Sequence, residues 1–164
     1  MKLLVCAMEA SSNIHLKELK KYLSHDVKLV GVFDKELGNP LYDLTALAIM
    51  GIVDALKKLR FFFKLRDELV DLAKDCDKVL LMDSSGFNLP LAKKLRETYP
   101  NKEIIYYILP QAWAWKKGRV KKLEAYCAKL CSIIPFESEI YNDKNKITYV
   151  GHPLLDEIKD FKQE

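Results

Sequence analysis

The sequence lacks the features that mark membrane-spanning and secreted chains. None of its apolar runs approaches the roughly 20 residues that a transmembrane helix needs. The apolar start, residues 2–7, has only the length of a strand and is followed by Glu9, which argues against a secretory signal. The net charge of +4 is mild, so composition alone does not indicate a polyanionic partner. With 164 residues, the chain has about the size of one domain.

Glycine and cysteine are scarce where specialised sites would need them. The first strand-to-helix turn, residues 9–13, contains no glycine, which excludes a Gly-rich phosphate loop there. Cys127 and Cys131 are four residues apart, but no second Cys or His pair stands near them to complete a zinc site. We therefore expect reduced thiols and no metal site.

What the sequence does contain is an alternation of apolar runs and helical segments. Continuous apolar strands that alternate with helices are typical of a parallel sheet covered on both faces. We therefore predict a Rossmann-like, three-layer α/β/α domain with a mostly parallel sheet. The predicted strands are 2–7, 27–33, 78–82, 104–109, 130–134 and 147–150. The first predicted helix is capped by Ser12 or Asn13 and ends near residue 23, and the second extends over 45–74 with a break near 58–60. Further helices are predicted over 89–99, 119–128 and 137–142.

Asp83 is the candidate catalytic residue. It directly follows the apolar run 78–82, and ligands of open α/β sheets bind outside the carboxyl ends of the strands. A partly desolvated carboxylate there could accept a proton from a substrate hydroxyl. Capping of the following helix is the plainer alternative, and position alone does not decide between the two. His152 follows the last predicted strand, so it could reach the same crevice or serve only in a turn.

The turn after the first predicted strand offers polar groups at the same edge. Ser11, Ser12 and the free amides of a helix N-terminus could hold an anion or sugar hydroxyls. Helix capping alone would also explain Ser12 and Asn13.

A second segment combines aromatic surface with positive charge. Both tryptophans, Trp113 and Trp115, follow the strand 104–109 and precede the basic run 116–122. Such a run could bind phosphate, anionic lipid or nucleic acid. The tryptophans stand before the charges and not between them, which differs from the interleaved pattern of single-strand nucleic-acid sites.

The predicted helix over residues 45–74 carries more apolar surface than burial in a core requires. Residues 46–53 are apolar around nearly the whole helical circumference. Further along, a buried stripe is predicted, formed by Leu59, Phe62, Phe63, Val70 and Ala73. Phe61 and Leu65 are predicted to fall outside this stripe, beside basic residues. Exposed apolar surface with a basic rim is typical of a membrane-binding or lipid-binding helix, although core packing explains most of these residues.

Taken together and in order, these segments resemble the lipid-A-disaccharide synthase family. The matching segments are Glu9-Ala10-Ser11, 47–56, Asp83 with Phe87-Asn88-Leu89, Pro110-Gln111-Ala112-Trp113-Ala114-Trp115 with Lys116 and Arg119, Pro135-Phe136-Glu137, and Val150-Gly151-His152-Pro153. Each segment is modest alone, but their order and spacing extend across nearly the entire chain. The chain departs from the family pattern at Met8, Ser12, Asn13 and Gly86.

The resemblance implies half of a two-Rossmann-domain glycosyltransferase of the GT-B architecture. This family transfers 2,3-diacylglucosamine from its UDP conjugate to the 6-hydroxyl of 2,3-diacylglucosamine 1-phosphate, with inversion and without a required metal or other cofactor. The match is to the acceptor-binding half, so residues 1–153 are expected to form that domain. Residues 154–164 are expected to start the connection to a donor-binding domain, without which the chain should be inactive.

The resemblance also assigns roles to individual residues. Asp83 becomes the base that deprotonates the acceptor hydroxyl, whereas Gly86 cannot supply the second carboxylate that the family often has there. Substrate contacts are implied for Glu9, Ser11, Asn88, Gln111, Trp115, Lys116, Arg119 and His152. Acyl-chain or membrane contacts are implied for Ile49, Met50, Ile52, Val53, Phe61 and Leu65.

The implied partners are the acylated glucosamine 1-phosphate acceptor, the UDP-diacylglucosamine donor and an anionic membrane surface. The implied location is peripheral, on the cytoplasmic face of the inner membrane of a Gram-negative bacterium. No nucleic acid is expected, and a homodimer is left open. From the residues alone, two other functions also stay open: a Rossmann-like module that binds RNA or another polyanion, and another sugar-nucleotide enzyme such as an epimerase.

Overall fold

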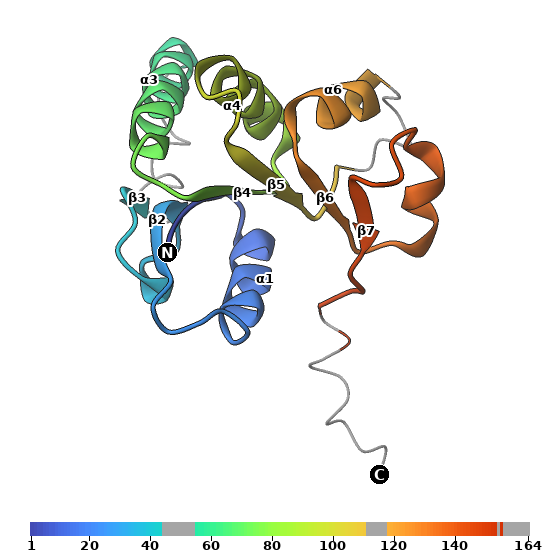
Figure 1. Cartoon of the computed structure of the whole chain (residues 1–164). Helices are drawn as coiled ribbons and strands as arrows, with labels where there is room; N and C mark the ends of the chain where they lie inside the picture. Colours follow the sequence, from blue (N-terminus) through green and yellow to red (C-terminus); the bar gives the residue numbers. More distant parts are fainter. Residues whose placement is uncertain (44–54, 111–117, 154, 156–164) are drawn as a thin grey trace.

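The structure, a computed structural model, describes residues 1–43, 55–110, 118–153 and 155 (Figure 1). Its described strands form one seven-stranded sheet in the order β3-β2-β1-β4-β5-β6-β7, and every neighbouring pair is parallel. The strands are β1 (Lys2–Ala7), β2 (Lys28–Phe33), β3 (Tyr42–Asp43), β4 (Lys78–Met82), β5 (Glu103–Tyr107), β6 (Lys129–Ser132) and β7 (Ile147–Tyr149). The predicted parallel α/β fold is confirmed.

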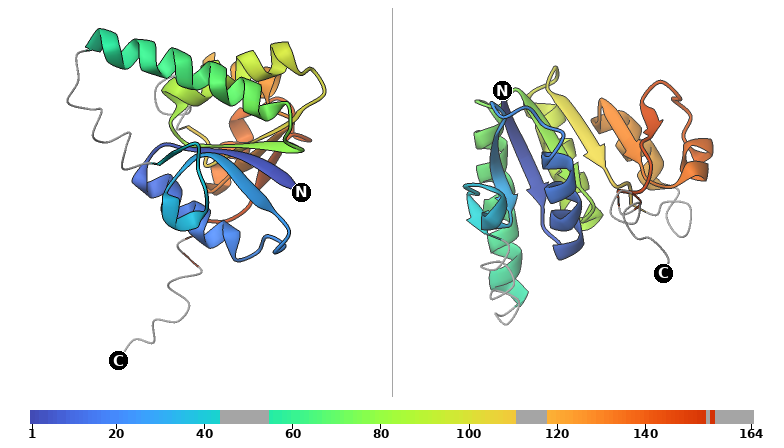
Figure 2. Two further views of the ribbon diagram at one scale, coloured as in Figure 1. Left: turned by 90° about the vertical axis from the view of Figure 1, so that its left-hand side faces the viewer. Right: turned by 90° about the horizontal axis from the view of Figure 1, so that it is seen from below.

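Helices cover the two faces of the sheet unequally. The described helices are α1 (Ala10–Lys20), α3 (Ala55–Ala73), α4 (Ser85–Thr98) and α6 (Gly118–Tyr126), with short 3₁₀ helices η1 (Lys35–Leu37) and η3 (Pro135–Ile140). Helices α3, α4 and α6 lie side by side on one face, whereas α1 lies on the other (Figures 1 and 2). Within the described ranges, no helix is long and apolar enough to cross a membrane.

The central strands carry the core because their side chains alternate between the two faces. In β1, Leu4 and Cys6 join the apolar cluster under α3, α4 and α6, while Leu3 and Val5 join the cluster under α1. The neighbouring strand β2 needs glycine at Gly31, where φ is +121° and an added Cβ would lie 2.2 Å from the Val5 carbonyl oxygen. Close strand packing therefore depends on this glycine.

The chain leaves the two central strands toward opposite faces. After β1 it enters α1 on one face and returns in β2; after β4 it enters α4 on the other face and returns in β5. The order of the sheet thus reverses between β1 and β4. In open α/β sheets, the crevice outside the carboxyl ends of such a strand pair is where ligands bind.

Several predicted boundaries are corrected. Helix α1 begins at Ala10, and Asn13 does not cap it: its side-chain amide donates to the carbonyls of Ala7 (2.9 Å) and Glu9 (2.8 Å). Helix α4 begins four residues earlier than predicted, at Ser85. Helix α3 runs unbroken through 58–60. The two-residue strand β3 was not predicted, and the helix expected over 137–142 is the 3₁₀ helix η3.

Candidate functional site

Two loops meet at the reversal point between β1 and β4. Ala7 pairs in register with Met82, so the residues that follow these strands emerge side by side. The Ser84 hydroxyl donates to the Glu9 carboxylate over 2.7 Å and joins the two loops directly. Asp83, adjacent to Ser84, thereby lies at the carboxyl edge where the sequence predicted it.

The turn that carries Asp83 has an unusual backbone. Asp83 and Ser84 have φ angles of 48° and 39°, in the left-handed region that side chains other than glycine rarely adopt. The Asn88 side-chain amide donates to the carbonyls of Met82 and Asp83, each over 3.0 Å. The hydroxyl of Tyr106 also donates to the Asp83 carbonyl. These tertiary hydrogen bonds hold the turn in a conformation that would otherwise be costly.

Asn88 makes contacts that the resemblance did not imply. Its side chain is fully buried, and its amide is engaged by backbone carbonyls. The substrate contact that the resemblance implies for Asn88 stays a prediction; the hydrogen bonds that the structure describes join its amide to the Asp83 turn. Sequence reasoning missed these hydrogen bonds because they depend on tertiary structure.

The carboxyl group of Asp83 is a stronger base than an ordinary aspartate. Partial burial raises its pKa, and the nearby Glu9 carboxylate raises that pKa further, against a smaller lowering by the Ser84 amide. A carboxylate accepts a proton more efficiently when its pKa lies closer to the pH at which the protein works. The arrangement suits general-base chemistry, as the sequence predicted for Asp83.

A cavity of about 710 Å³ opens beside this carboxylate. One side is polar and holds Glu9, Asp83 and Ser84. The remaining lining comes largely from α3 and α4 and is mostly apolar: Met8, Leu59, Phe62, Phe63, Arg66, Ser85, Gly86, Phe87 and Pro90. The site can therefore accept a ligand that joins a hydroxyl-bearing group to an apolar one.

Aromatic contacts organise the apolar wall. The rings of Phe62 on α3 and Phe87 on α4 lie 5.8 Å apart between centroids. The Arg66 guanidinium lies 5.2 Å from the centroid of Phe63, a cation–π contact at the rim of the cavity. Phe63 is 50% exposed and Leu59 is 53% exposed, so much of this wall is free to cover a ligand.

The predicted orientation of α3 is partly wrong: Val70 and Ala73 are buried as predicted, but other positions differ. Leu65, expected outside the buried stripe, is completely buried in the core with Leu69 and Ala73. Leu59 and Phe63, expected inside the stripe, are exposed. The buried positions 65, 69 and 73 follow i, i+4, i+8, which defines one helix face.

Phe61 is likewise not a free surface residue. It is partly buried, and its ring lies 5.4 Å from that of Tyr42 and 5.7 Å from that of Phe62. Among the α3 side chains from residue 59 onward, Leu59 and Phe63 are the exposed large apolar ones, and both line the cavity beside Asp83.

The other predicted site residues are distributed more widely. Ser11 is exposed in the first turn of α1, and Arg119 is partly exposed in the first turn of α6. His152 packs edge-on against His15, with 5.8 Å between ring centroids, and lines a different groove on the α1 side of the sheet. Of the residues that the structure describes, Arg119 and His152 are not among those lining the Asp83 cavity. Ile49, Met50, Ile52, Val53, Gln111, Trp113, Trp115 and Lys116 lie outside the described residues.

Metal ligands do not gather here. Across 1–43, 55–110 and 118–153, no group of three or more His, Cys, Asp or Glu side chains could hold a metal ion.

Comparison with known proteins gives a consistent result over nearly the whole chain. Residues 3–164 match the sequence profile of a family described as lipid-A-disaccharide synthetase. A lipid-A-disaccharide synthase of Helicobacter pylori (strain HPAG1) is 54% identical over 162 residues, which are 99% of this chain and 44% of that protein. The corresponding protein of Campylobacter jejuni (strain RM1221) is 43% identical over 173 residues, 98% of this chain and 47% of its own. The chain thus spans less than half the length of these relatives.

Proposed function

This chain belongs to the lipid-A-disaccharide synthetase family, and from that premise we propose that it is the acceptor-binding part of a lipid A glycosyltransferase. The reaction transfers 2,3-diacylglucosamine from its UDP conjugate to the 6-hydroxyl of 2,3-diacylglucosamine 1-phosphate. One observation carries the proposal: Asp83, with its raised pKa, lines a cavity whose other wall is mostly apolar. A cavity of this composition matches an acceptor that presents a sugar hydroxyl beside acyl chains.

In the proposed step, the Asp83 carboxylate takes the proton of the acceptor 6-hydroxyl. The freed oxygen forms a bond to the anomeric carbon of the donor sugar. The bond from that carbon to the UDP oxygen breaks, and its electron pair leaves with UDP, so the configuration inverts. Asn88 and Tyr106 assist indirectly because their hydrogen bonds fix the Asp83 backbone.

The apolar wall has a separate task in this proposal. Leu59, Phe62, Phe63 and Phe87 would cover an acyl chain of the acceptor. Each Å² of apolar surface removed from water stabilises the complex by about 25 cal/mol. Arg66 supplies a positive charge at the rim that suits a phosphate or an anionic lipid head group. The same surface would hold the protein against the cytoplasmic face of a Gram-negative inner membrane.

We propose that residues 1–153 form the acceptor domain and that 154–164 begin the connection to a donor-binding domain. The relatives are more than twice as long as this chain, which leaves length for such a domain. The family match also favours a glycosyltransferase over a polyanion-binding module.

Asp83→Asn tests the assignment in a protein that includes the donor-binding part. Asn has nearly the same shape and tolerates a left-handed backbone, so the fold should persist. Loss of a general base should lower kcat about 10²- to 10⁴-fold. Glu103→Gln, at the opposite edge of the sheet, is the matched control and should leave kcat unchanged. Near-normal turnover by Asp83→Asn would rule out the base assignment.

A further inference from the structure

The three helices on one face of the sheet carry an excess of positive charge. Helix α3 has five basic and three acidic residues, whereas α4 and α6 each have three basic residues and one acidic residue. Together they have a net charge of +6, compared with +4 for the whole chain. The positive charge is therefore concentrated in these helices, which lie side by side (Figures 1 and 2).

Exposed lysines account for much of this charge on α4 and α6. Lys121 and Lys122 are exposed on α6, whereas Val120 and Leu123 between and beside them are buried. Lys94 is exposed on α4. Among the residues that the structure describes, these three lysines form no ion pair. The described acidic side chains therefore leave the charge of these lysines unneutralised.

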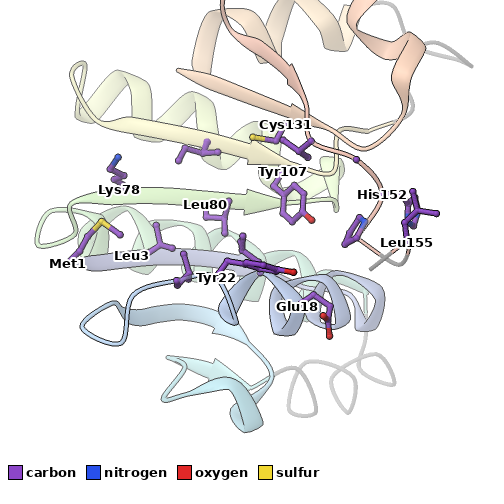
Figure 3. A pocket seen from close by; sticks show the side chains of 16 residues that line it. Met1, Leu3, Glu18, Tyr22, Lys78, Leu80, Tyr107, Cys131, His152 and Leu155 are labelled. Carbon is purple, nitrogen blue, oxygen red and sulfur yellow. The ribbon is translucent and has the colours of Figure 1, made fainter. Parts of the chain in front are cut away.

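The opposite face of the sheet is more evenly charged. Helix α1 has two lysines and one glutamate. Of the residues that line the groove beside α1, Glu18 and Lys78 carry charged side chains, and their signs are opposite (Figure 3). The two faces of the domain therefore differ in charge.

We propose that the face formed by α3, α4 and α6 docks on an anionic lipid bilayer. Lys94, Lys121 and Lys122 contact the lipid phosphates, while Leu59 and Phe63, both exposed on α3, enter the interface. A surface that combines basic residues with exposed apolar side chains is typical of proteins that bind a membrane from one side. Each Lys or Arg near an anionic membrane strengthens binding about fivefold.

The composition of this face favours a bilayer over a nucleic acid. Proteins that bind single strands stack the bases on aromatic rings set among the basic residues. Within the described chain, no exposed residue of α4 or α6 is aromatic. A bilayer, in contrast, offers an apolar interior to Leu59 and Phe63 as well as anionic head groups to the lysines.

This inference rests on the proposed function and adds the surface that meets the membrane. Helices α3 and α4 also line the cavity beside Asp83. Docking of the helical face places that cavity next to the bilayer, so that an acylated acceptor can enter it directly from the lipid. Vesicle binding needs no turnover, so loss of docking and loss of the Asp83 base are measured separately.

Sedimentation of the 164-residue chain with vesicles tests the docking surface. The vesicles consist of phosphatidylcholine with or without phosphatidylglycerol, which is anionic. The wild type should bind the anionic vesicles more tightly, and added salt should weaken that binding. Lys121→Gln combined with Lys122→Gln removes two charges from the face and should weaken the binding about 25-fold. Gln is a good helix former, so Tm should stay unchanged.

The matched control is Lys17→Gln combined with Lys20→Gln, which changes two exposed lysines of α1 on the opposite face. The sheet separates α1 from the proposed surface by roughly 20 Å. This distance exceeds the Debye length of about 8 Å at physiological salt. The control should therefore change the affinity for anionic vesicles by less than about twofold.

Equal weakening by the two pairs of substitutions would overturn the proposal, because total charge and not this face would then govern binding. Equal binding of the wild type to vesicles with and without phosphatidylglycerol would overturn it as well. Tighter binding of a single-stranded oligonucleotide than of the vesicles, reduced by Lys121→Gln with Lys122→Gln, would assign the face to a nucleic acid and not to a bilayer.

Discussion

At the two edges of the sheet, the surroundings shift the pKa of a carboxyl group in opposite directions. At the amino edge, Glu103 lies between Lys78 (2.8 Å) and Lys129 (3.3 Å), and its pKa is lowered chiefly by the hydrogen bond from Lys78. At the carboxyl edge, the pKa of Asp83 is raised by burial and by Glu9. One carboxylate is stabilised as an anion, and the other is held in surroundings that favour its protonated form.

The backbone conformation also distinguishes the carboxyl edge of the sheet from the amino edge. In the described chain, the residues other than glycine with positive φ are Asp83, Ser84 and Ile108, and all three directly follow the carboxyl ends of β4 and β5. Residues in sparsely populated backbone regions cost about 1–3 kcal/mol each and tend to gather at functional sites. Unfavourable charge and backbone strain are therefore concentrated at the edge of the sheet where the chemistry is proposed.

Helix α3, whose exposed residues line the carboxyl-edge cavity, gives the largest expected effect on stability. Leu65→Glu should destabilise the fold by about 3–5 kcal/mol, because it places an unpaired charged carboxylate at a fully buried position. Phe63→Glu, half a turn away and half exposed, should cost less than about 1 kcal/mol. Urea unfolding of the two variants measures the difference. Similar losses for both would show that α3 is rotated relative to the described orientation.

The same pair tests the proposed membrane contact. Phe63→Glu should retain the fold yet reduce flotation with anionic vesicles, because it places a negative charge on the apolar wall beside Arg66. Glu97→Gln on α4 is the matched surface control and should float at least as well as the wild type. Flotation of Phe63→Glu at the wild-type level would remove α3 from the proposed membrane surface.

The sequence predicted the positions of helices and strands better than it predicted which face of a helix is buried. Six of the seven described strands were found because short apolar runs alternate with helices, and Asp83 was found because it directly follows such a run. The buried face of helix α3 was predicted only in part because apolar residues surround the helix: positions 59, 61, 62, 63, 65, 69, 70, 72 and 73 leave no single face defined. Only packing against the sheet selects the face that includes Leu65. The groove that His152 lines on the α1 side likewise follows from tertiary structure.

Asn88 gives the next largest effect. Asn88→Ala should cost about 1–3 kcal/mol, because the buried carbonyls of Met82 and Asp83 lose their donor. If Asn88 positions the Asp83 turn, kcat of a protein that includes the donor-binding part should also fall while KM changes little. Exposed Asn101, changed to Ala, is the control for both measurements. Loss of stability with full kcat would leave Asn88 a purely structural residue.

The smallest expected effect is a pair of opposite pH dependences. The pKa of folded Glu103 is lowered, so its carboxylate contributes stability above the unfolded pKa, and that contribution is lost as pH falls. Glu103→Gln should therefore reduce the free energy of unfolding at pH 7, by less than about 1 kcal/mol for so exposed an ion pair. The reduction should disappear toward pH 3.

For Asp83 the sign reverses. Its folded pKa lies above the unfolded value, so the native state binds the proton more tightly and ionisation costs stability as pH rises through the raised pKa. Asp83→Asn should consequently increase the free energy of unfolding at pH 7 and leave it unchanged near pH 3. Urea unfolding of both variants at the two pH values measures the opposite slopes. If Asp83→Asn also lost stability at pH 7, the carboxylate would be a stabilising group like Glu103, and the distinction between the two edges would fail.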